Sequence, residues 1–356
     1  MERDLNNNLK CFSEKVSQDL KNLIEKEIED QNIQESLILS SSGSTSKSTT
    51  LYVIRHEMML AHAKEINHIF NSHQRSKWLI ALPLYYMGGL SIYYRCLERN
   101  IPYEQLLKWD PFLFNEICLE KEITHSSLVP SQLHDLLIKR IQLPRTLKYL
   151  FIGGDALSDE LKRIARELHY PVYQTYGASE FCSQLATSPI DQEGIKLLPF
   201  VKAKTIDQDL YISSPYHFDK KILIDENKNV KTLNYHELLQ DGYYPMSDQV
   251  HLKKRTLSQI KRTDHLIKID GKLTSPSDVE FELLKDGPTH LNNSIAIVIS
   301  KDSKRGHCLI CCHCINLEDQ FLTKLKNKKI ATQSVEKILM TSTGKKLRNI
   351  DFYHSS

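Results

Sequence analysis

Short apolar runs alternate with helical patterns along the first half of this 356-residue chain, and this alternation is the strongest constraint on its fold. The apolar runs at 36–40 and 77–85 precede helical patterns at 56–71 and 88–100. Residues 123–140 and 147–169 each predict a strand followed by a helix. Repeated units of this kind favour an α/β fold, in which mostly parallel sheets are covered by helices and ligands bind beyond the carboxyl ends of the strands.

The second half of the chain has a different pattern. Short alternating runs between polar turns predict antiparallel strands over 201–273, and residues 275–329 predict a helix, two strands and a helix. We therefore predict two domains, a large one at 1–262 with a β-rich segment and a small α+β one at 263–356. An amphipathic pattern at 8–30 predicts a further packing helix near the N-terminus.

Composition excludes several classes of protein. The 47 basic and 44 acidic residues are spread along the chain, which argues against a nucleic-acid or membrane surface built on bulk charge. No stretch approaches the roughly 18 apolar residues of a membrane span, and the N-terminus lacks the apolar core of a signal peptide. Without a secretion signal, the eight cysteines indicate reduced thiols. We expect a cytoplasmic protein with a small-molecule or protein partner.

A serine-rich segment follows the first apolar run. Every residue from Ser40 to Thr50, except Lys47, is Ser, Thr or Gly. A position between a strand and a helix would allow its backbone N–H groups to converge on an anion. The phosphate-loop pattern G-x-x-x-x-G-K-[ST] is absent, however. This segment alone therefore leaves a flexible connection and a phosphate-binding loop both open.

A cysteine cluster near the C-terminus also has two interpretations. A Cys-x-x-Cys spacing can begin a zinc site, but the usual second pair at a distance is missing. On a strand, Cys311 and Cys312 would point to opposite faces, and apolar residues are interleaved with them. A buried strand is the favoured interpretation over a zinc site. The cluster comprises His307, Cys308, Cys311, Cys312, His313 and Cys314.

Six separated stretches resemble the adenylate-forming acyl-CoA synthetase family, most closely its o-succinylbenzoate-CoA ligase branch. They follow the family's order from residue 41 to residue 348. The matching stretches are the phosphate loop SSSGSTSKST, LPLYYMGGLS (82–91), the adenine loop YQTYGASE (173–180), MSD (246–248), the hinge KRTDHLIKIDGK (261–272) and the Thr-Gly-Lys loop TSTGKKLR (341–348).

The resemblance implies a fold and a reaction. A large AMP-binding domain would carry a small mobile C-terminal lid domain. A carboxylate would attack the α-phosphorus of ATP, giving an acyl-adenylate and pyrophosphate, and the thiol of CoA would then displace AMP. The cofactors would be ATP, Mg²⁺ and CoA. The substrate would be a small carboxylic acid, and for the o-succinylbenzoate-CoA ligase branch this acid is o-succinylbenzoate, in menaquinone biosynthesis. A homodimer is also compatible with the resemblance.

The resemblance assigns nucleotide-binding residues as well. Asp248 would accept hydrogen bonds from the ribose hydroxyls, Arg262 would contact ribose or phosphate, and Tyr176 would stack on adenine. The remaining residues that would contact the nucleotide are Ser41, Ser42, Gly43, Ser44, Thr45, Lys47, Gly153, Gly154, Thr175 and Gly177.

The residues implied for the chemistry lie in the same stretches. Glu180 would bind Mg²⁺, and Ser179 would contact phosphate. Lys345 would bridge the substrate carboxylate and the α-phosphate, whereas its neighbour Lys346 is expected to face solvent. Asp264 falls at the hinge of the C-terminal domain. The positions expected beside the acyl substrate are Tyr86, Gly88, Gly154 and Gln174.

The chain also departs from the family pattern. Ser46, Ser48 and Thr49 replace a glycine, a proline and a phosphate-contacting lysine, and Tyr86 replaces a frequent histidine. The phosphate loop begins already at Ser41, which predicts a shortened N-terminal region. Two alternatives therefore accompany the CoA ligase: an adenylating enzyme with another acyl acceptor, and a catalytically impaired member that binds a nucleotide or a partner.

Overall fold

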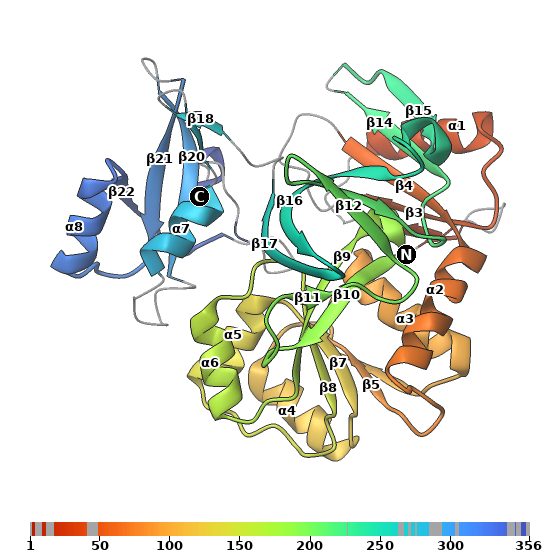
Figure 1. The fold of residues 1–356 in the computed structure, drawn as a ribbon, viewed down its shortest axis with the longest axis horizontal. Coiled ribbons are helices and arrows are strands. Elements are labelled where there is room, and N and C mark those ends of the chain that lie inside the picture. The colour runs from red at the N-terminus through yellow and green to blue at the C-terminus, as the bar shows by residue number, and fades with distance from the viewer. Residues whose placement is uncertain are drawn as a thin grey trace.

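A computed structural model of the chain shows helices packed against several separate β-sheets (Figure 1). None of the helices it describes is both long and apolar enough to cross a bilayer. The structure describes residues 2–3, 9–11, 18–40, 49–225, 227–262, 267–269, 272–274, 276–284, 294–302, 306–339, 346 and 350–353.

The central sheet has six strands in the order β10-β9-β8-β7-β5-β6. All neighbours from β9 to β6 are parallel, and β10 alone runs antiparallel, to β9. This arrangement confirms the predicted, largely parallel sheet. Its strands are β5 (Trp78–Ile80), β6 (Tyr103–Gln105), β7 (His125–Leu128), β8 (Tyr149–Ile152), β9 (Val172–Ala178) and β10 (Ser183–Pro189).

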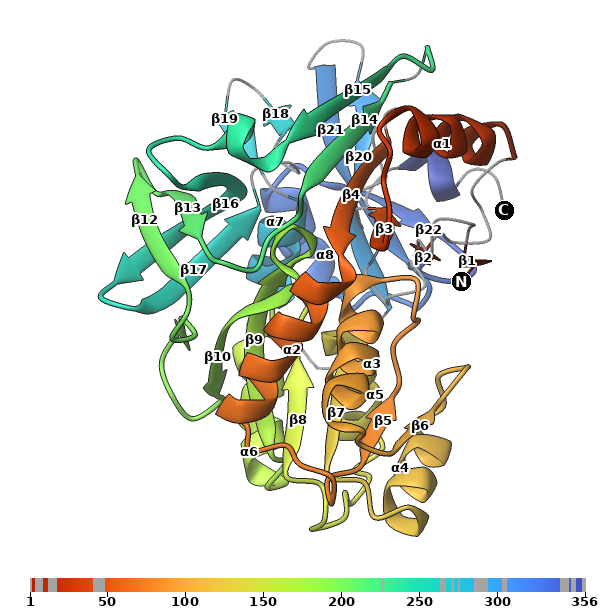
Figure 2. The ribbon, with the colours of Figure 1, turned by 90° about the vertical axis from the view of Figure 1, so that its right-hand side faces the viewer.

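Helices cover both faces of this sheet because its strands are apolar on both sides. Trp78 and Ile80 join the core beneath α2 and α3, whereas Leu79 between them joins the core beneath α4, α5 and α6. Figure 2 shows α2 and α3 in front of the sheet. The helices are α2 (His56–Ile69), α3 (Met87–Arg99), α4 (Pro111–Glu120), α5 (Pro130–Ile138) and α6 (Asp159–Glu167).

Local sequence signals set where several of these helices begin and end. Ser158 caps the start of α6, because its hydroxyl accepts a hydrogen bond from the N–H of Leu161 at 3.3 Å. Asp110 caps α4 in the same way, and Pro111 occupies the first helical turn, where its missing N–H costs nothing. Helix α4 was not predicted from the sequence.

A second sheet contains the first strands of the chain, in the order β1-β2-β3-β4-β14-β15. Helix α1 (Gln18–Asp30) packs on it through Ile24 and Ile28. The predicted helix at 8–30 is wrong at its start, because Leu9–Cys11 form a strand parallel to β3. The strands are β1 (Glu2–Arg3), β2 (Leu9–Cys11), β3 (Ser36–Ser40), β4 (Thr49–Arg55), β14 (Lys220–Ile224) and β15 (Val230–Asn234).

The setting of the serine-rich segment differs from the expectation. Strands β3 and β4 are antiparallel, with Ser40 opposite Leu51, and α2 begins only at His56. The segment at 41–48 therefore joins two strands, and the predicted order of strand, loop and helix is wrong. Strand β4 was not predicted, because its first two residues are both threonine and continue the serine-rich composition. Only a short apolar run remains in the rest of the strand. Residues 41–48 themselves lie outside the described structure.

The third sheet is antiparallel, in the order β11-β17-β16-β13-β12. It confirms the strands predicted over 201–273, although β14 and β15 from this interval belong to the second sheet instead. A short helical turn, η2 (Tyr235–Leu238), follows β15. The strands are β11 (Ile195–Lys196), β12 (Lys202–Ile206), β13 (Asp209–Ser213), β16 (Tyr244–Lys253) and β17 (Thr256–Arg262).

The C-terminal elements follow the predicted order of helix, strand, strand and helix, with one additional strand, β22. They lie at the left of Figure 1. Their described buried residues pack in clusters that contain no residue before Val279. The boundary between residues 262 and 263 stays a prediction. The elements are β18 (Ile267–Ile269), β19 (Lys272–Thr274), α7 (Pro276–Leu284), β20 (Ile295–Asp302), β21 (Gly306–His313), α8 (Asp319–Asn327), β22 (Ala331–Ser334) and η4 (Ile350–Tyr353).

The cysteine cluster lies on and just beyond β21, and the buried-strand interpretation is confirmed. Cys311 packs with the core of α7 and α8, whereas Cys312 packs on the opposite face with Ile350 and Tyr353. Burial raises the pKa of Cys311 to about 12 and that of Cys312 to about 11. Both thiols are therefore protonated near neutral pH.

Candidate functional site

The hairpin of β9 and β10 extends past the carboxyl ends of the parallel strands. β9 pairs with β8 only as far as Gln174, and its later residues pair with β10 alone. A short turn, η1 (Ser179–Phe181), connects the two strands. The predicted adenine loop therefore lies where ligands bind in sheets of this class.

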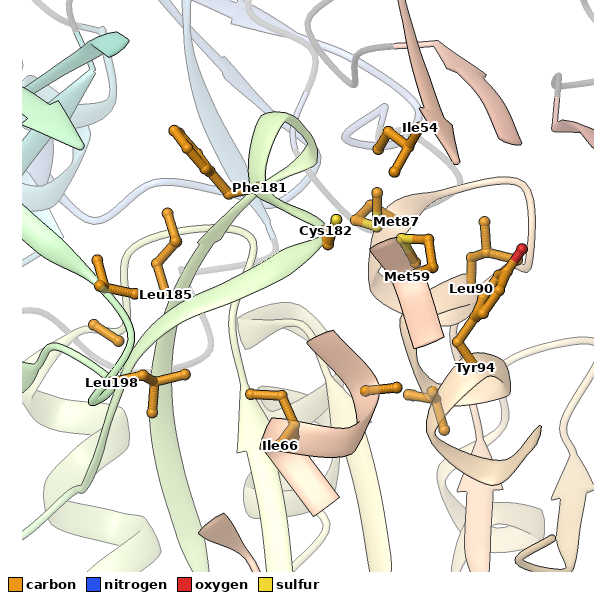
Figure 3. Packing of buried hydrophobic residues seen from close by; sticks show 14 of the residues in the cluster. Ile54, Met59, Ile66, Met87, Leu90, Tyr94, Phe181, Cys182, Leu185 and Leu198 are labelled. Atoms are coloured by element: carbon orange, nitrogen blue, oxygen red, sulfur yellow. The ribbon is translucent and has the colours of Figure 1, made fainter. Parts of the chain in front are cut away.

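Buried side chains hold this hairpin in place. Phe181 is fully buried, and the backbone N–H of Phe218 donates to the carbonyl oxygen of Glu180 at 3.0 Å. Figure 3 shows Phe181, Cys182 and Leu185 of the hairpin among the buried side chains of the core. The turn that carries Glu180 is thus fixed by packing on one side and by backbone hydrogen bonding on the other.

Gly177 is required by the geometry of the hairpin itself. A Cβ atom at this position would lie 2.2 Å from the carbonyl oxygen of Ser183. Any other residue would force the two strands apart, because the clashing atom belongs to the backbone. Glycine is therefore needed here for β9 to pair with β10, independently of any role toward a nucleotide.

Tyr176 and Asp248 meet although 72 residues separate them in the sequence. The Tyr176 hydroxyl donates to Asp248 Oδ2 at 2.7 Å, and Asp248 is buried on β16. The backbone of Arg262, on β17, lies directly opposite that of Asp248 in the ladder. Three positions predicted to contact adenine, ribose and phosphate are thus neighbours, whereas their contacts with a nucleotide stay predictions.

Glu180 is held by a tyrosine from another sheet. The Tyr52 hydroxyl, on β4, donates to Glu180 Oε1 at 2.9 Å. Burial, together with the negative charge of Glu180, raises the pKa of Tyr52 well above its usual range, so the phenol stays protonated and remains a donor. The pKa of Tyr244, which is also buried near this carboxylate, is raised for the same two reasons.

The donor set around Glu180 fits Mg²⁺. One carboxylate oxygen accepts from Tyr52, and the other makes no hydrogen bond to any described residue. Within the described ranges, no three His, Cys, Asp or Glu side chains gather as a metal site. Mg²⁺ usually takes one or two protein carboxylates and completes its octahedron with phosphate oxygens and water. A single carboxylate beside a phosphate site is sufficient for that mode of binding.

The glycine pair after β8 has a structural role of its own. A Cβ atom on Gly153 would lie 2.2 Å from Thr175 Oγ1, which donates to the carbonyl oxygen of Ile152 at 3.2 Å. Gly154 has a φ of +85°, which disfavours other residues. These glycines allow the end of β8 to approach β9 closely. Their predicted contacts with adenine or the acyl chain remain untested.

The predicted acyl-side residues other than Gly154 lie at the start of α3 and on β9. Tyr86 directly precedes α3, and its ring centre is 4.7 Å from that of Tyr85. Gln174 is half-buried on β9. Gly89 is the more constrained glycine of its pair, because a Cβ there would lie 2.4 Å from the carbonyl oxygen of Pro83, whereas one at Gly88 would meet only a leucine side chain at 3.2 Å. The substrate roles of Tyr86, Gly88 and Gln174 stay predictions.

Several predicted residues lie outside the described structure. They are Ser41, Ser42, Gly43, Ser44, Thr45 and Lys47 of the serine-rich segment, Asp264 of the hinge, and Lys345. Ser179 is described in η1, half-buried, and its phosphate contact stays a prediction.

The expectation that Lys346 faces solvent is wrong. Lys346 Nζ lies 2.7 Å from Glu280 Oε1 on α7, and the two side chains are only 11% and 8% exposed. The other oxygen of Glu280 accepts from the backbone N–H of Ile297 on β20 at 2.8 Å. This buried ion pair therefore holds Lys346, the residue after Lys345, against the core of the C-terminal elements.

Sequence reasoning missed Arg95, a cation within the buried part of α3. Its Nη2 donates to Gln184 Oε1 at 3.0 Å, its guanidinium lies 5.5 Å from the centre of the Trp78 ring, and Gln184 pairs with Gly177 of the adenine loop. Burial lowers the pKa of Arg95 to about 10, so it remains charged at neutral pH. No carboxylate of the described residues forms an ion pair with Arg95. The sequence signal that could have identified Arg95 is an arginine at a position on an otherwise apolar helix face.

Sequence comparison identifies the family of the chain. The model of the family described as AMP-binding enzyme matches residues 8–216, more than half of the chain, and the chain therefore belongs to that family. Among individual relatives, it is 27% identical over 223 residues to 2-succinylbenzoate–CoA ligase of Bacillus velezensis, which covers 59% of this chain and 45% of the relative. It is 33% identical over 117 residues to the enzyme of the same name from Geobacillus kaustophilus, covering 32% of this chain and 24% of the relative. The chain thus spans less than half the length of these relatives.

Solved structures share the fold. Bacillus subtilis o-succinylbenzoate CoA synthetase in complex with its acyl-adenylate intermediate matches with a TM-score of 0.72 and 20% identity, over 88% of this chain and 68% of that chain. The same enzyme with ATP and magnesium ion matches with a TM-score of 0.71 and 19% identity, over the same shares of the two chains. These likenesses confirm the adenylate-forming α/β fold.

Proposed function

We propose that this protein activates a carboxylic acid with ATP, forming an acyl-adenylate and pyrophosphate, and then transfers the acyl group to CoA. One observation carries the proposal. The β9–β10 hairpin joins Tyr176 to Asp248 of β16 at one point and Glu180 to Tyr52 of β4 at another, so the residues suited to adenine, ribose and Mg²⁺ gather around one hairpin. Relatives named as CoA ligases support the choice of CoA as the acceptor.

Each residue has a separate task in this reaction. The Tyr176 ring offers an aromatic face to adenine, and the acceptor-only carboxylate of Asp248 suits the ribose hydroxyls. Glu180 would hold Mg²⁺, which neutralises phosphate charge during the displacement. Lys345 would place a second positive charge between the attacking carboxylate and the α-phosphate. Together these groups position the reactants and oppose the charge that develops in the transition state.

We infer o-succinylbenzoate as the acid from two considerations. The relatives that match this chain are named for it. In addition, o-succinylbenzoate carries a second carboxylate, which suits a buried cation such as Arg95 that lacks a carboxylate partner in the described part of the chain. A substrate with one carboxylate would leave that charge uncompensated.

Release of pyrophosphate in the presence of ATP, Mg²⁺ and a panel of carboxylic acids tests the proposal. We expect release with o-succinylbenzoate to exceed that with the other acids, and CoA to yield the thioester. Release without thioester would favour a different acyl acceptor. Absence of release with every acid, together with normal nucleotide binding, would favour the impaired member indicated by Thr49 and Tyr86.

Substitution of Arg95 tests the choice of acid. We expect Arg95→Met to raise KM for o-succinylbenzoate at least about tenfold, since a buried hydrogen-bonded charge contact is lost, and to affect benzoate much less. Arg99→Met is the matched control, one turn along α3, because Arg99 already pairs with Glu98 at 3.3 Å. Equal effects of Arg95→Met on both acids, or a fall in melting temperature that accounts for the loss, would contradict this role.

A further inference from the structure

Tyr52 belongs to none of the motifs that indicate nucleotide binding, yet it contacts the predicted metal ligand. It lies on β4, three residues after Thr49, and only 4% of its surface is exposed. Its hydroxyl reaches Glu180 across 128 positions of sequence. The strand that leaves the serine-rich segment is therefore bonded directly to the carboxylate expected to bind Mg²⁺.

The surroundings of Tyr52 hold its ring in one orientation. The Phe218 ring packs against it with centroids 5.1 Å apart. Lys221, directly opposite Tyr52 on β14, places Nζ 5.9 Å from the centre of the Tyr52 ring and 3.5 Å from the Tyr244 hydroxyl. Among the residues that the structure describes, the titratable groups around Tyr52 besides Glu180 are therefore Tyr244 and Lys221. A donor fixed in this way can also fix the acceptor to which it is bonded.

We propose that Tyr52 is a positioning residue for Glu180, which holds one carboxylate oxygen so that the other is presented to Mg²⁺. The inference rests on the proposed function, because it assumes that Glu180 binds the metal. Without the hydroxyl, Glu180 would sample other rotamers, and metal binding would have to order it.

The test is Mg²⁺-dependent ATP binding by the full chain, measured by calorimetry over a range of Mg²⁺ concentrations. Mg²⁺ should strengthen ATP binding, and half of this effect is reached at a certain Mg²⁺ concentration. We expect Tyr52→Phe to increase that concentration about tenfold, the usual effect of losing a group that orients a metal ligand. Binding of AMP in EDTA should stay within about twofold of wild type, since that measurement involves no metal. Tyr235→Phe is the matched control, because Tyr235 belongs to the same aromatic cluster without a described hydrogen bond to Glu180.

Two substitutions of Glu180 test the same hydrogen bond by changing its acceptor. Glu180→Asp retains the charge but shortens the side chain, and should weaken the Mg²⁺ response as Tyr52→Phe does. When Glu180→Gln is already present, Tyr52→Phe should cause no further loss. Glu180→Asp also keeps the test decisive if Tyr52→Phe unfolds the protein.

Three outcomes would overturn the inference. A wild-type Mg²⁺ response in Tyr52→Phe would contradict it and leave the proposed function intact. A parallel loss of AMP affinity in EDTA would show that Tyr52 acts only on the structure of the pocket. Wild-type protein that binds ATP equally well with and without Mg²⁺ would overturn the role of Glu180, and with it both this inference and the proposed function.

Discussion

Replacing Lys345 with alanine should slow acid-dependent pyrophosphate release by about 10²- to 10³-fold, the usual cost of removing one preorganised group that stabilises transition-state charge. Lys345 lies in the Thr-Gly-Lys stretch, and its ammonium group would neutralise charge between the attacking carboxylate and the α-phosphate. Single-turnover release with saturating ATP measures this step directly. AMP affinity should change much less than this rate, because binding of AMP involves neither an attacking carboxylate nor displacement of pyrophosphate from the α-phosphorus.

The control for Lys345→Ala must be a lysine without a buried partner. Lys326→Ala is suitable, because Lys326 is exposed on α8 and its removal leaves the net charge equal to that of Lys345→Ala. Its rate of release should match that of wild type. Equal rates in Lys345→Ala and wild type would remove Lys345 from the proposed mechanism.

Replacing the adjacent Lys346 with methionine should instead destabilise the C-terminal elements. Loss of one partner from a buried ion pair leaves the other charge uncompensated, at a cost of about 3–5 kcal/mol. Glu280 is the carboxylate that would lose this lysine, and its side chain is only 8% exposed. Hydrogen exchange along β20, including the amide of Ile297, measures the loss locally. Tryptophan fluorescence does not, since both tryptophans, Trp78 and Trp109, lie in the N-terminal part of the chain.

A double variant separates charge from packing at this ion pair. Lys346→Met with Glu280→Gln removes both charges and keeps an oxygen to accept from Ile297 N–H. It should recover most of the protection lost in Lys346→Met. If the single variant exchanges like wild type, or the double variant is as unstable as the single one, the ion pair does not stabilise these elements.

The parallel sheet could be predicted because its signals are local. Apolar runs that end in glycine or polar turns, each followed by a helical pattern, recur along the first half of the chain. The helix start at Ser158 was predictable for the same reason, since the cap and the N–H that it satisfies are three residues apart. The motifs that resemble those of the family also indicated residues 173–180 and Asp248, and the structure brings Tyr176 into contact with Asp248.

Predictions failed where a distant partner decides the structure. Leu9–Cys11 fit a helical spacing, but they pair with β3. Thr49 and Thr50 continue a serine-rich segment, yet they pair with β14, far along the chain. Lys346 lies in a polar stretch typical of a solvated loop, and it is buried only because Glu280 on α7 meets it. Sequence patterns report local preference, and pairing across the chain can override it.

The sequence by itself determined the family, the alternation of strands and helices that builds a parallel sheet, and the residue types suited to adenine, ribose and metal. Only the tertiary structure decided which of these residues meet and what holds them: Tyr176 against Asp248, Tyr52 against Glu180, and Lys346 against Glu280. The physical reason is that each such contact joins elements from distant parts of the chain. The amino-acid sequence is the same whether a carboxylate or a phenol contacts water or a buried group, so only the packed fold distinguishes these two environments.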